Sequence, residues 1–398
     1  KRLRLVAEVT NPISLPDVVT ARYDSRSTGF LTAIAILLGV LGYLGTQILA
    51  MAMVLQSILA DVASIGLLPL GACMAISCAV LVFYCVTGGI IASVYTDLVQ
   101  GIIMVVAALL VVSATVASVD GGLEGMTRTI LADDAESMNP WGTRGIVGCL
   151  SWYFVFVFGV AGQPHLITKL MMTKKLDDAR VMLPMSVGGF LLTALLWISI
   201  GLCMRTLVLQ GAHPPLGEPD QASPEFLKTY AHPVLAGVVF AGLMAAIMST
   251  ADSFLNIGAA AVVHDIPRAL RGRSLDNELL WARVATVIIA AIASGVALAS
   301  GKMVALLGAV GWSVFSGAIV PTVAIGFNWK RATPLACNLA ILTSLALNVG
   351  LQVFSVTLPH LFYNGALSLL ASLTVFYVVS IVSSPPRIPP DIETAMDL

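Results

Sequence analysis

The chain has 398 residues, of which 58% are hydrophobic and only 11% are charged, and its mean hydropathy is +0.93. A soluble domain carries about 25% charged residues, so this composition indicates a protein that lies largely within a lipid bilayer. The formal net charge of −1 gives no electrostatic basis for binding nucleic acid.

Ten apolar runs follow one another along the chain, each near or above the roughly 20 residues that a helix needs to cross a bilayer. They cover residues 29–56, 68–90, 95–119, 146–168, 183–209, 233–263, 281–300, 303–327, 334–357 and 361–382. None alternates in the way that a membrane β-strand does, so we predict an all-α polytopic membrane protein with about ten transmembrane helices.

These runs divide the chain into a cytoplasmic loop segment at 1–28, a transmembrane domain at 29–382 and a tail at 383–398. The tail is Pro-rich and polar, and we expect it to be disordered. If Lys1 is cytoplasmic, 16 of the 21 lysines and arginines lie inside and the other 5 lie outside. Basic loops favour the cytoplasmic side, so we predict a multi-pass plasma-membrane protein with both ends of this chain in the cytoplasm.

Two carboxylates lie inside the apolar runs, Asp97 in the third run and Asp252 in the sixth. A charge at the bilayer centre costs about 2.5–3.5 kcal/mol, so each acid needs a compensating partner. Helical spacing places several oxygen-bearing side chains on the face of Asp252, namely Ser249, Asp252, Ser253 and Asn256. Neither run contains Lys or Arg, so we expect a small metal cation or a proton as the partner, with hydrogen bonding between helices as the alternative.

The stretch GVAGQPH at 159–165 interrupts the fourth run. Pro164 removes a backbone donor and obstructs the preceding helical turn. Broken helices in membranes line cavities and mark the solute sites of transporters, although a simple kink in a packed helix is the alternative. In the first run, Tyr43, Thr46 and Gln47 share a turn and either line a solute cavity or join neighbouring helices.

Several stretches resemble the sodium:solute symporter family, most closely its proline-symporter branch. They are AEVTNPISLPDVVTARY at 7–23, TGGIIASVYTDLVQ at 87–100, AGQPHLITKLM at 161–171, AAIMSTADSFLNIGAAAVVHDI at 245–266 and VGWSVFSGAIVPTVAIGFNWKRAT at 310–333. The resemblance implies a leucine-transporter-like inverted-repeat helix bundle. It also implies an N-terminally incomplete bundle, because about three helices, including the first core helix, precede the loop at 7–23 in family members.

The same resemblance assigns ion ligands. The shared sodium site would use the carbonyl of Ala246 and the hydroxyls of Ser249 and Thr250, with two further ligands on the first core helix. A second sodium site, present in some members, would use Asp97, Ser249, Asp252 and Ser253. The co-transported Na+ is the only cofactor that we expect.

The resemblance also assigns a solute site, to which we add the residues of the helix break and of the first run. Its expected members are Tyr43, Gln47, Phe156, Val160, Gly162, Gln163 and Pro164. Phe156 keeps an aromatic ring that the proline branch has, whereas Val160 replaces a second one, so proline itself is in question as the solute.

We therefore predict a sodium-coupled symporter that moves a small organic solute, an amino acid such as proline or a carboxylate, by alternating access. Its expected partners are the membrane lipid and the solute, and the oligomeric state is left open. One alternative is a truncated remnant that no longer transports, which a stop codon upstream of Lys1 would support. Another is a proton-coupled carrier, which uptake without sodium would support. No side chains have the spacing of a catalytic site, so we do not expect an enzyme.

Overall fold

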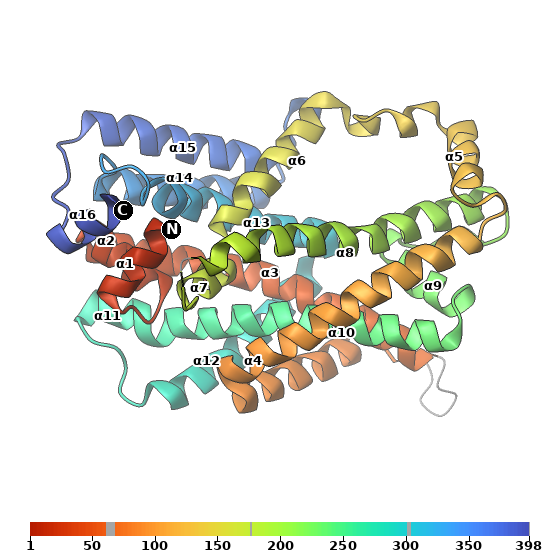
Figure 1. Ribbon diagram of the computed structural model, residues 1–398, viewed down its shortest axis with the longest axis horizontal. Helices are drawn as coiled ribbons and strands as arrows, with labels where there is room; N and C mark the ends of the chain where they lie inside the picture. Colours follow the sequence, from red (N-terminus) through yellow and green to blue (C-terminus); the bar gives the residue numbers. More distant parts are fainter. Residues whose placement is uncertain (61–67, 176, 301–303, 398) are drawn as a thin grey trace.

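The computed structural model describes residues 1–60, 68–175, 177–300 and 304–397 (Figure 1). Within these ranges it is helical and has no strand, and ten segments are long and apolar enough to cross a membrane. Their bounds are Arg26–Ala60, Leu70–Gly88, Tyr95–Ala117, Gly142–Met171, Arg180–Leu209, Pro233–Arg271, Glu278–Ser300, Leu306–Ile325, Pro334–Val353 and Asn364–Val382. Each overlaps one predicted run, so the predicted all-α polytopic architecture is confirmed.

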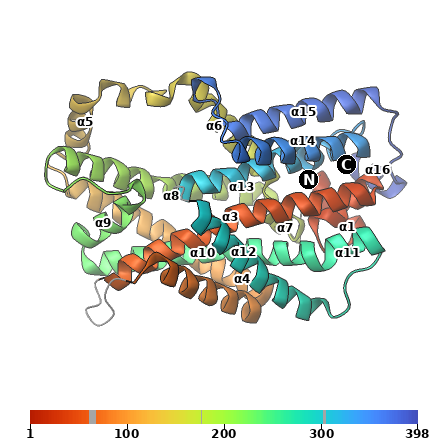
Figure 2. The ribbon, with the colours of Figure 1, turned by 180° about the vertical axis from the view of Figure 1, so that it is seen from behind.

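The long helices run along the longest axis of the molecule, and short elements gather at its two ends (Figure 1). Both termini lie at one end, with α1 (Arg2–Thr10), α11 (Ile266–Arg271) and α16 (Pro390–Asp397). At the opposite end lie α5 (Gly122–Asp133) and α9 (Ala222–Thr229), as the reverse view in Figure 2 also shows. The two ends of the chain therefore share one side of the bundle.

The core is built around α3 (Arg26–Ala60), which packs against α10 (Pro233–Ala260), α12 (Glu278–Ser300) and α13 (Val304–Ile319). Small residues let these helices approach closely. A Cβ added to Gly45 in α3 would lie 2.8 Å from the carbonyl oxygen of Ala293 in α12. The remaining long helices are α8 (Asp178–Leu209), α14 (Pro334–Val353) and α15 (Asn364–Val382).

Helix α4 (Leu70–Ala117) contains two spans within 48 residues of helical backbone. The hydroxyls of Tyr84 and Thr96 hydrogen-bond to each other, although they are 12 residues apart. In a straight helix the backbone positions of two residues twelve apart are separated by about 18 Å along the axis, which is too far for these two side chains to meet. The backbone therefore turns back on itself between the two spans, and Asp97 lies at the start of the second arm.

The tail after Ser383 differs from the predicted disorder. Residues Pro390–Asp397 form α16, and Ile392, Ala395 and Met396 are buried as the helix packs on α1. Spacing of i, i+3 and i+4 places these three side chains on one helix face, which the Pro-rich composition around them obscured. Hydrogen bonds to Asp397 and Glu393 raise the pKa of Lys330 and hold the tail to the loop before α14.

Candidate cation and solute site

Asp97 joins the second arm of α4 to two other elements. Its Oδ1 accepts a hydrogen bond from the hydroxyl of Ser249 in α10, and its Oδ2 accepts one from the ammonium of Lys169 at 2.8 Å. The structure thus brings together the third and sixth spans at the residues that the sequence singled out. Neither of the two runs contains Lys or Arg, but the long side chain of Lys169 reaches Asp97 from just beyond the fourth apolar run.

Asp252 is buried in α10, with 1% of its surface exposed. Its Oδ1 accepts a hydrogen bond from the side-chain amide of Asn256 at 3.1 Å, whereas its Oδ2 has no hydrogen-bond partner in the part of the chain that the structure describes. Cys85, in the first arm of α4, lies beside this carboxylate, and Tyr84 lies near both Asp252 and Asp97. A buried carboxylate oxygen without a partner is costly, so this position is suited to a cation or a proton.

Three further oxygen atoms on α10 lie within one helical turn. The Thr250 hydroxyl donates to the carbonyl of Ala246 at 3.1 Å, and Ser249 lies beside it in the sequence. All three residues are half-buried, and Ser253, one turn further along, is buried. A hydroxyl that donates its proton keeps its lone pairs. Hard oxygen donors of this kind are suited to a hard cation such as Na+.

The predicted break in the fourth span is present. Helix α6 (Gly145–Gly159) passes into a 3₁₀ turn at Val160–Gly162, Gln163 is extended with φ −72° and ψ 111°, and α7 (Pro164–Met171) then begins. Proline suits the first helical position, where its missing donor has no partner to lose. A Cβ on Gly162 would lie 2.8 Å from the backbone oxygen of Phe315, so this turn packs tightly on α13.

Gln163 is fully buried at this break. Its side-chain nitrogen donates to the carbonyl of Gly159 at 3.4 Å, and its Oε1 has no hydrogen-bond partner among the residues described. An unpaired amide oxygen beside an interrupted helix is able to accept a hydrogen bond from a polar solute.

Aromatic rings form a continuous series next to the break. The ring of Phe156 lies 5.2 Å from that of Trp312, which lies 6.3 Å from Tyr43, and Tyr43 lies 4.9 Å from Phe254. His165, directly after Pro164, makes an edge contact with Phe254 at 4.6 Å. These rings supply the large apolar contact area that small-molecule sites use.

The structure brings together some of the predicted solute residues and not others. Tyr43 and Phe156 lie within the aromatic series, but the Val160 side chain is 47% exposed and Gln47 makes no side-chain hydrogen bond with the described residues. Neither Trp312 nor Phe254 is among the solute residues predicted from the sequence. In the structure Gly159 lies opposite Trp312, where a Cβ would meet the indole ring.

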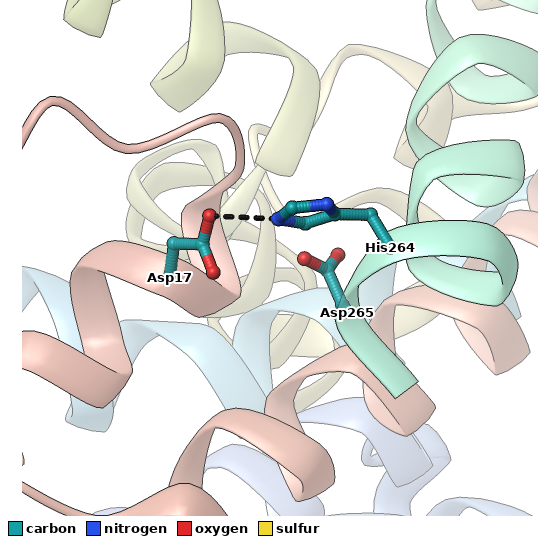
Figure 3. A group of neighbouring side chains, drawn as sticks. All are labelled: Asp17, His264 and Asp265. Carbon is teal, nitrogen blue, oxygen red and sulfur yellow. Dashed lines mark hydrogen bonds and ion pairs between the residues drawn. The ribbon is translucent and has the colours of Figure 1, made fainter. Parts of the chain in front are cut away.

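A separate polar cluster contains Asp17, His264 and Asp265 (Figure 3). His264 pairs with Asp17 at 3.1 Å, Ser14 donates to Asp265, and Arg268 donates to both oxygens of Asp17 at 3.1 Å. Ligand atoms of Asp17, His264 and Asp265 lie within 4.8 Å of one another, which is close enough to share a metal ion. Arg268 and His264 already pair with Asp17, so the cluster fastens α2 (Leu15–Tyr23) to the π-helical turn at Ala261–Asp265.

Comparisons with known proteins agree with this architecture. The chain is 24% identical to the sodium/pantothenate symporter of Haemophilus influenzae over 384 residues, covering 95% of this chain and 76% of that protein. It is 27% identical to the high-affinity proline transporter PutP of Bacillus subtilis over 314 residues, covering 77% of this chain and 64% of that protein.

Among solved structures, the chain resembles the substrate-bound outward-open state of a Na+-coupled sialic acid symporter. The TM-score is 0.74 at 17% identity, and the match covers 97% of this chain and 80% of the other. At this identity the likeness shows the fold, which is leucine-transporter-like as predicted. The sequence also matches the sodium:solute symporter family over residues 1–337. The chain therefore belongs to the sodium:solute symporter family, whose members couple the movement of small solutes to Na+.

Proposed function

We propose that this protein carries a small organic solute bearing a carboxylate, such as an amino acid, into the cell together with Na+ by alternating access. The observation that carries the proposal is the hydrogen bond between Asp97 and Ser249, which gathers oxygen donors from α4 and α10. An interrupted helix between Gly162 and Pro164 supplies the solute site that such a carrier needs.

Sodium would be held by Ala246, Ser249 and Thr250. The geometry supports this role because the carbonyl and the two hydroxyls lie within one turn of α10. The predicted second group shares Ser249; its Asp252 and Ser253 add carboxylate and hydroxyl oxygens on the same helix, whereas Asp97 on α4 already pairs with Lys169. Oxygen ligands of this kind replace the hydration shell of a hard cation.

The solute would lie against the aromatic series and the helix break. Tyr43 and Phe156 would bury its apolar part, while the Oε1 of Gln163 would accept a hydrogen bond from a solute N–H or O–H. The proteins named above are symporters or transporters of pantothenate and proline, and both of these solutes carry a carboxylate. That shared group is the reason for proposing a carboxylate-bearing solute here.

The sodium gradient provides adequate energy for accumulation. One charge moving through 100 mV contributes about 2.3 kcal/mol. A tenfold sodium gradient adds about 1.4 kcal/mol. Together, about 3.7 kcal/mol supports an accumulation of several hundredfold for each coupled ion. We place the end of the bundle that carries both termini in the cytoplasm, following the distribution of basic residues.

The test is uptake of labelled proline, pantothenate and a panel of other amino acids and carboxylates into proteoliposomes. We expect uptake of at least one solute to require an inward sodium gradient and to stop when choline replaces sodium.

A proton-coupled carrier is the second candidate, because the Oδ2 of Asp252 has no hydrogen-bond partner among the residues described and is able to hold a proton. Uptake that a proton gradient drives equally well without sodium would establish that candidate and overturn ours.

A further inference from the structure

We propose that the ammonium group of Lys169 takes the place of a second sodium ion at Asp97, so that one sodium ion is coupled to each solute. This inference rests on the sodium-coupled symport proposed above and concerns the number of ions that the same site moves.

The contacts of Asp97 are the first support. One carboxylate oxygen accepts from the Lys169 ammonium at 2.8 Å, and the other accepts from the Ser249 hydroxyl. The side chains of Lys169 and Asp97 are 39% and 19% exposed, so the carboxylate is the more enclosed member of the pair. Charge-assisted hydrogen bonds of this kind are the stronger ones in proteins, and a sodium ion at Asp97 would have to displace this one.

The balance of charge is the second support. Asp97 carries one negative charge and Lys169 one positive charge, so the pair is neutral as it stands. A sodium ion bound at Asp97 with Lys169 in place would have to share this one carboxylate with the ammonium, so two positive charges would lie side by side. A lysine at this carboxylate therefore excludes the ion that a lone carboxylate would attract.

The state of Ser249 is the third support. Because its hydroxyl donates its proton to Asp97, the lone pairs of its oxygen remain free for an ion on α10. The ion pair at Asp97 thus orients one ligand of the sodium site that uses Ala246 and Thr250. The site would then hold one transported sodium ion on α10 beside one ammonium group, that of Lys169, which stays with the protein.

The position of Lys169 links this fixed charge to the solute. Lys169 lies in α7, which begins at Pro164 immediately after the helix break. His165 lies one helical turn before Lys169 on the same face, and its ring contacts Phe254 at 4.6 Å. Movement of α7 when solute binds would therefore move the ammonium relative to Asp97. Since the ammonium stays with the protein, it replaces an ion at the site without being transported.

The experiment compares the wild type with Lys169→Met, which removes the ammonium but keeps much of the side-chain volume. Proteoliposomes take up labelled solute, either proline or pantothenate according to which is transported, together with radioactive sodium. We expect one sodium per solute in the wild type, and two in Lys169→Met with a Hill coefficient for sodium approaching two. The double variant Asp97→Asn/Lys169→Met lacks both charges and should return to one sodium.

Lys174→Met is the matched control, because it removes the same charge from the segment after α7 and Lys174 has no described ion pair with Asp97. It should keep one sodium per solute. A wild type that already couples two sodium ions, an unchanged ratio in Lys169→Met, or the same gain in Lys174→Met would each overturn the inference while leaving sodium-coupled symport intact. Sodium-independent uptake by the wild type would instead overturn the proposed function and this inference with it.

A second measurement covers the case in which Lys169→Met no longer transports. Sodium that binds the folded protein raises its thermal unfolding midpoint, and the dependence on the logarithm of sodium concentration reports the number of ions bound. In detergent, that slope should be about twice as steep for Lys169→Met, or for Lys169→Gln as a polar substitute, as for the wild type. Equal slopes in the wild type and both variants would overturn the inference without reference to transport.

Discussion

Replacing Gly159 by alanine should displace a ring of the proposed solute site. The added Cβ would lie 2.4 Å from Nε1 of Trp312 and 3.1 Å from Cβ of Ser316. No ordinary Cβ contact is this short, so the indole has to move. Its Nε1 donates to the carbonyl of Val155 at 3.3 Å, and its ring lies 5.2 Å from that of Phe156. A shift of Trp312 would therefore break the hydrogen bond and disturb the neighbouring ring.

The size of the effect follows from these contacts. Overpacking a well-filled interior costs about 1–3 kcal/mol. A lost hydrogen bond adds about 0.5–1.5 kcal/mol. If about 2 kcal/mol of this total falls on the state that binds solute, the solute concentration for half-maximal uptake rises about thirtyfold. The indole N–H of Trp312 donates to Val155 and not to the oxygen atoms on α10, so the sodium concentration for half-maximal uptake should change by less than about twofold.

The assay is labelled-solute uptake at saturating sodium, with Gly189→Ala as the control. Gly189 lies within α8, and its added Cβ would have no atom within 4 Å. Both variants add one Cβ to a glycine with helical backbone, so the comparison separates the clash from the general effect of replacing a glycine. Half-maximal solute concentrations that agree within twofold between the two variants would refute the reasoning.

Four further substitutions, with Thr250→Ser as a control, test the ion and solute sites separately. Ser249→Ala and Thr250→Ala should each raise the half-maximal sodium concentration about tenfold, which corresponds to about 1.4 kcal/mol for one lost ligand, and should affect solute affinity less. Thr250→Ser keeps the oxygen and should behave as wild type. A loss in Thr250→Ser equal to that in Thr250→Ala would contradict the ligand role. Asp97→Asn should raise the half-maximal sodium concentration tenfold or more, because it leaves the charge of Lys169 uncompensated beside the ion. An unchanged dependence of uptake on sodium concentration would show that Asp97 does not act at the sodium site. Phe156→Ala should raise the half-maximal solute concentration about tenfold by removing an aromatic contact, with sodium dependence unchanged; equal changes in both would argue against a solute-specific role.

Much of the fold was predictable because a bilayer imposes local requirements. A helix in lipid satisfies its own backbone, so ten apolar runs were sufficient to predict ten spans without knowledge of their neighbours. The break at Gln163 and Pro164 was equally local, since proline acts on the helix that contains it. The face of α10 that carries Ser249 and Asp252 follows from helical spacing alone.

The bend in α4 was only partly predictable. Two apolar runs separated by a few residues indicated two spans, and the structure keeps helical backbone through the turn between them. What the sequence did not show is that Tyr84 and Thr96 meet across this turn. That contact depends on how the two arms pack, and it places Asp97 where α10 and α7 both reach it.

Composition and spacing by themselves determined the class of protein, the spans, the helix break and the polar face of α10. The partners of Asp97 and Asp17 were decided only by tertiary structure: Lys169 is 72 residues from Asp97, and His264 is 247 residues from Asp17. The same holds for α16, which is ordered by packing on α1 at the other end of the chain. The physical reason is that a helical pattern specifies which face is polar, whereas the neighbour that meets this face depends on how all the helices pack together.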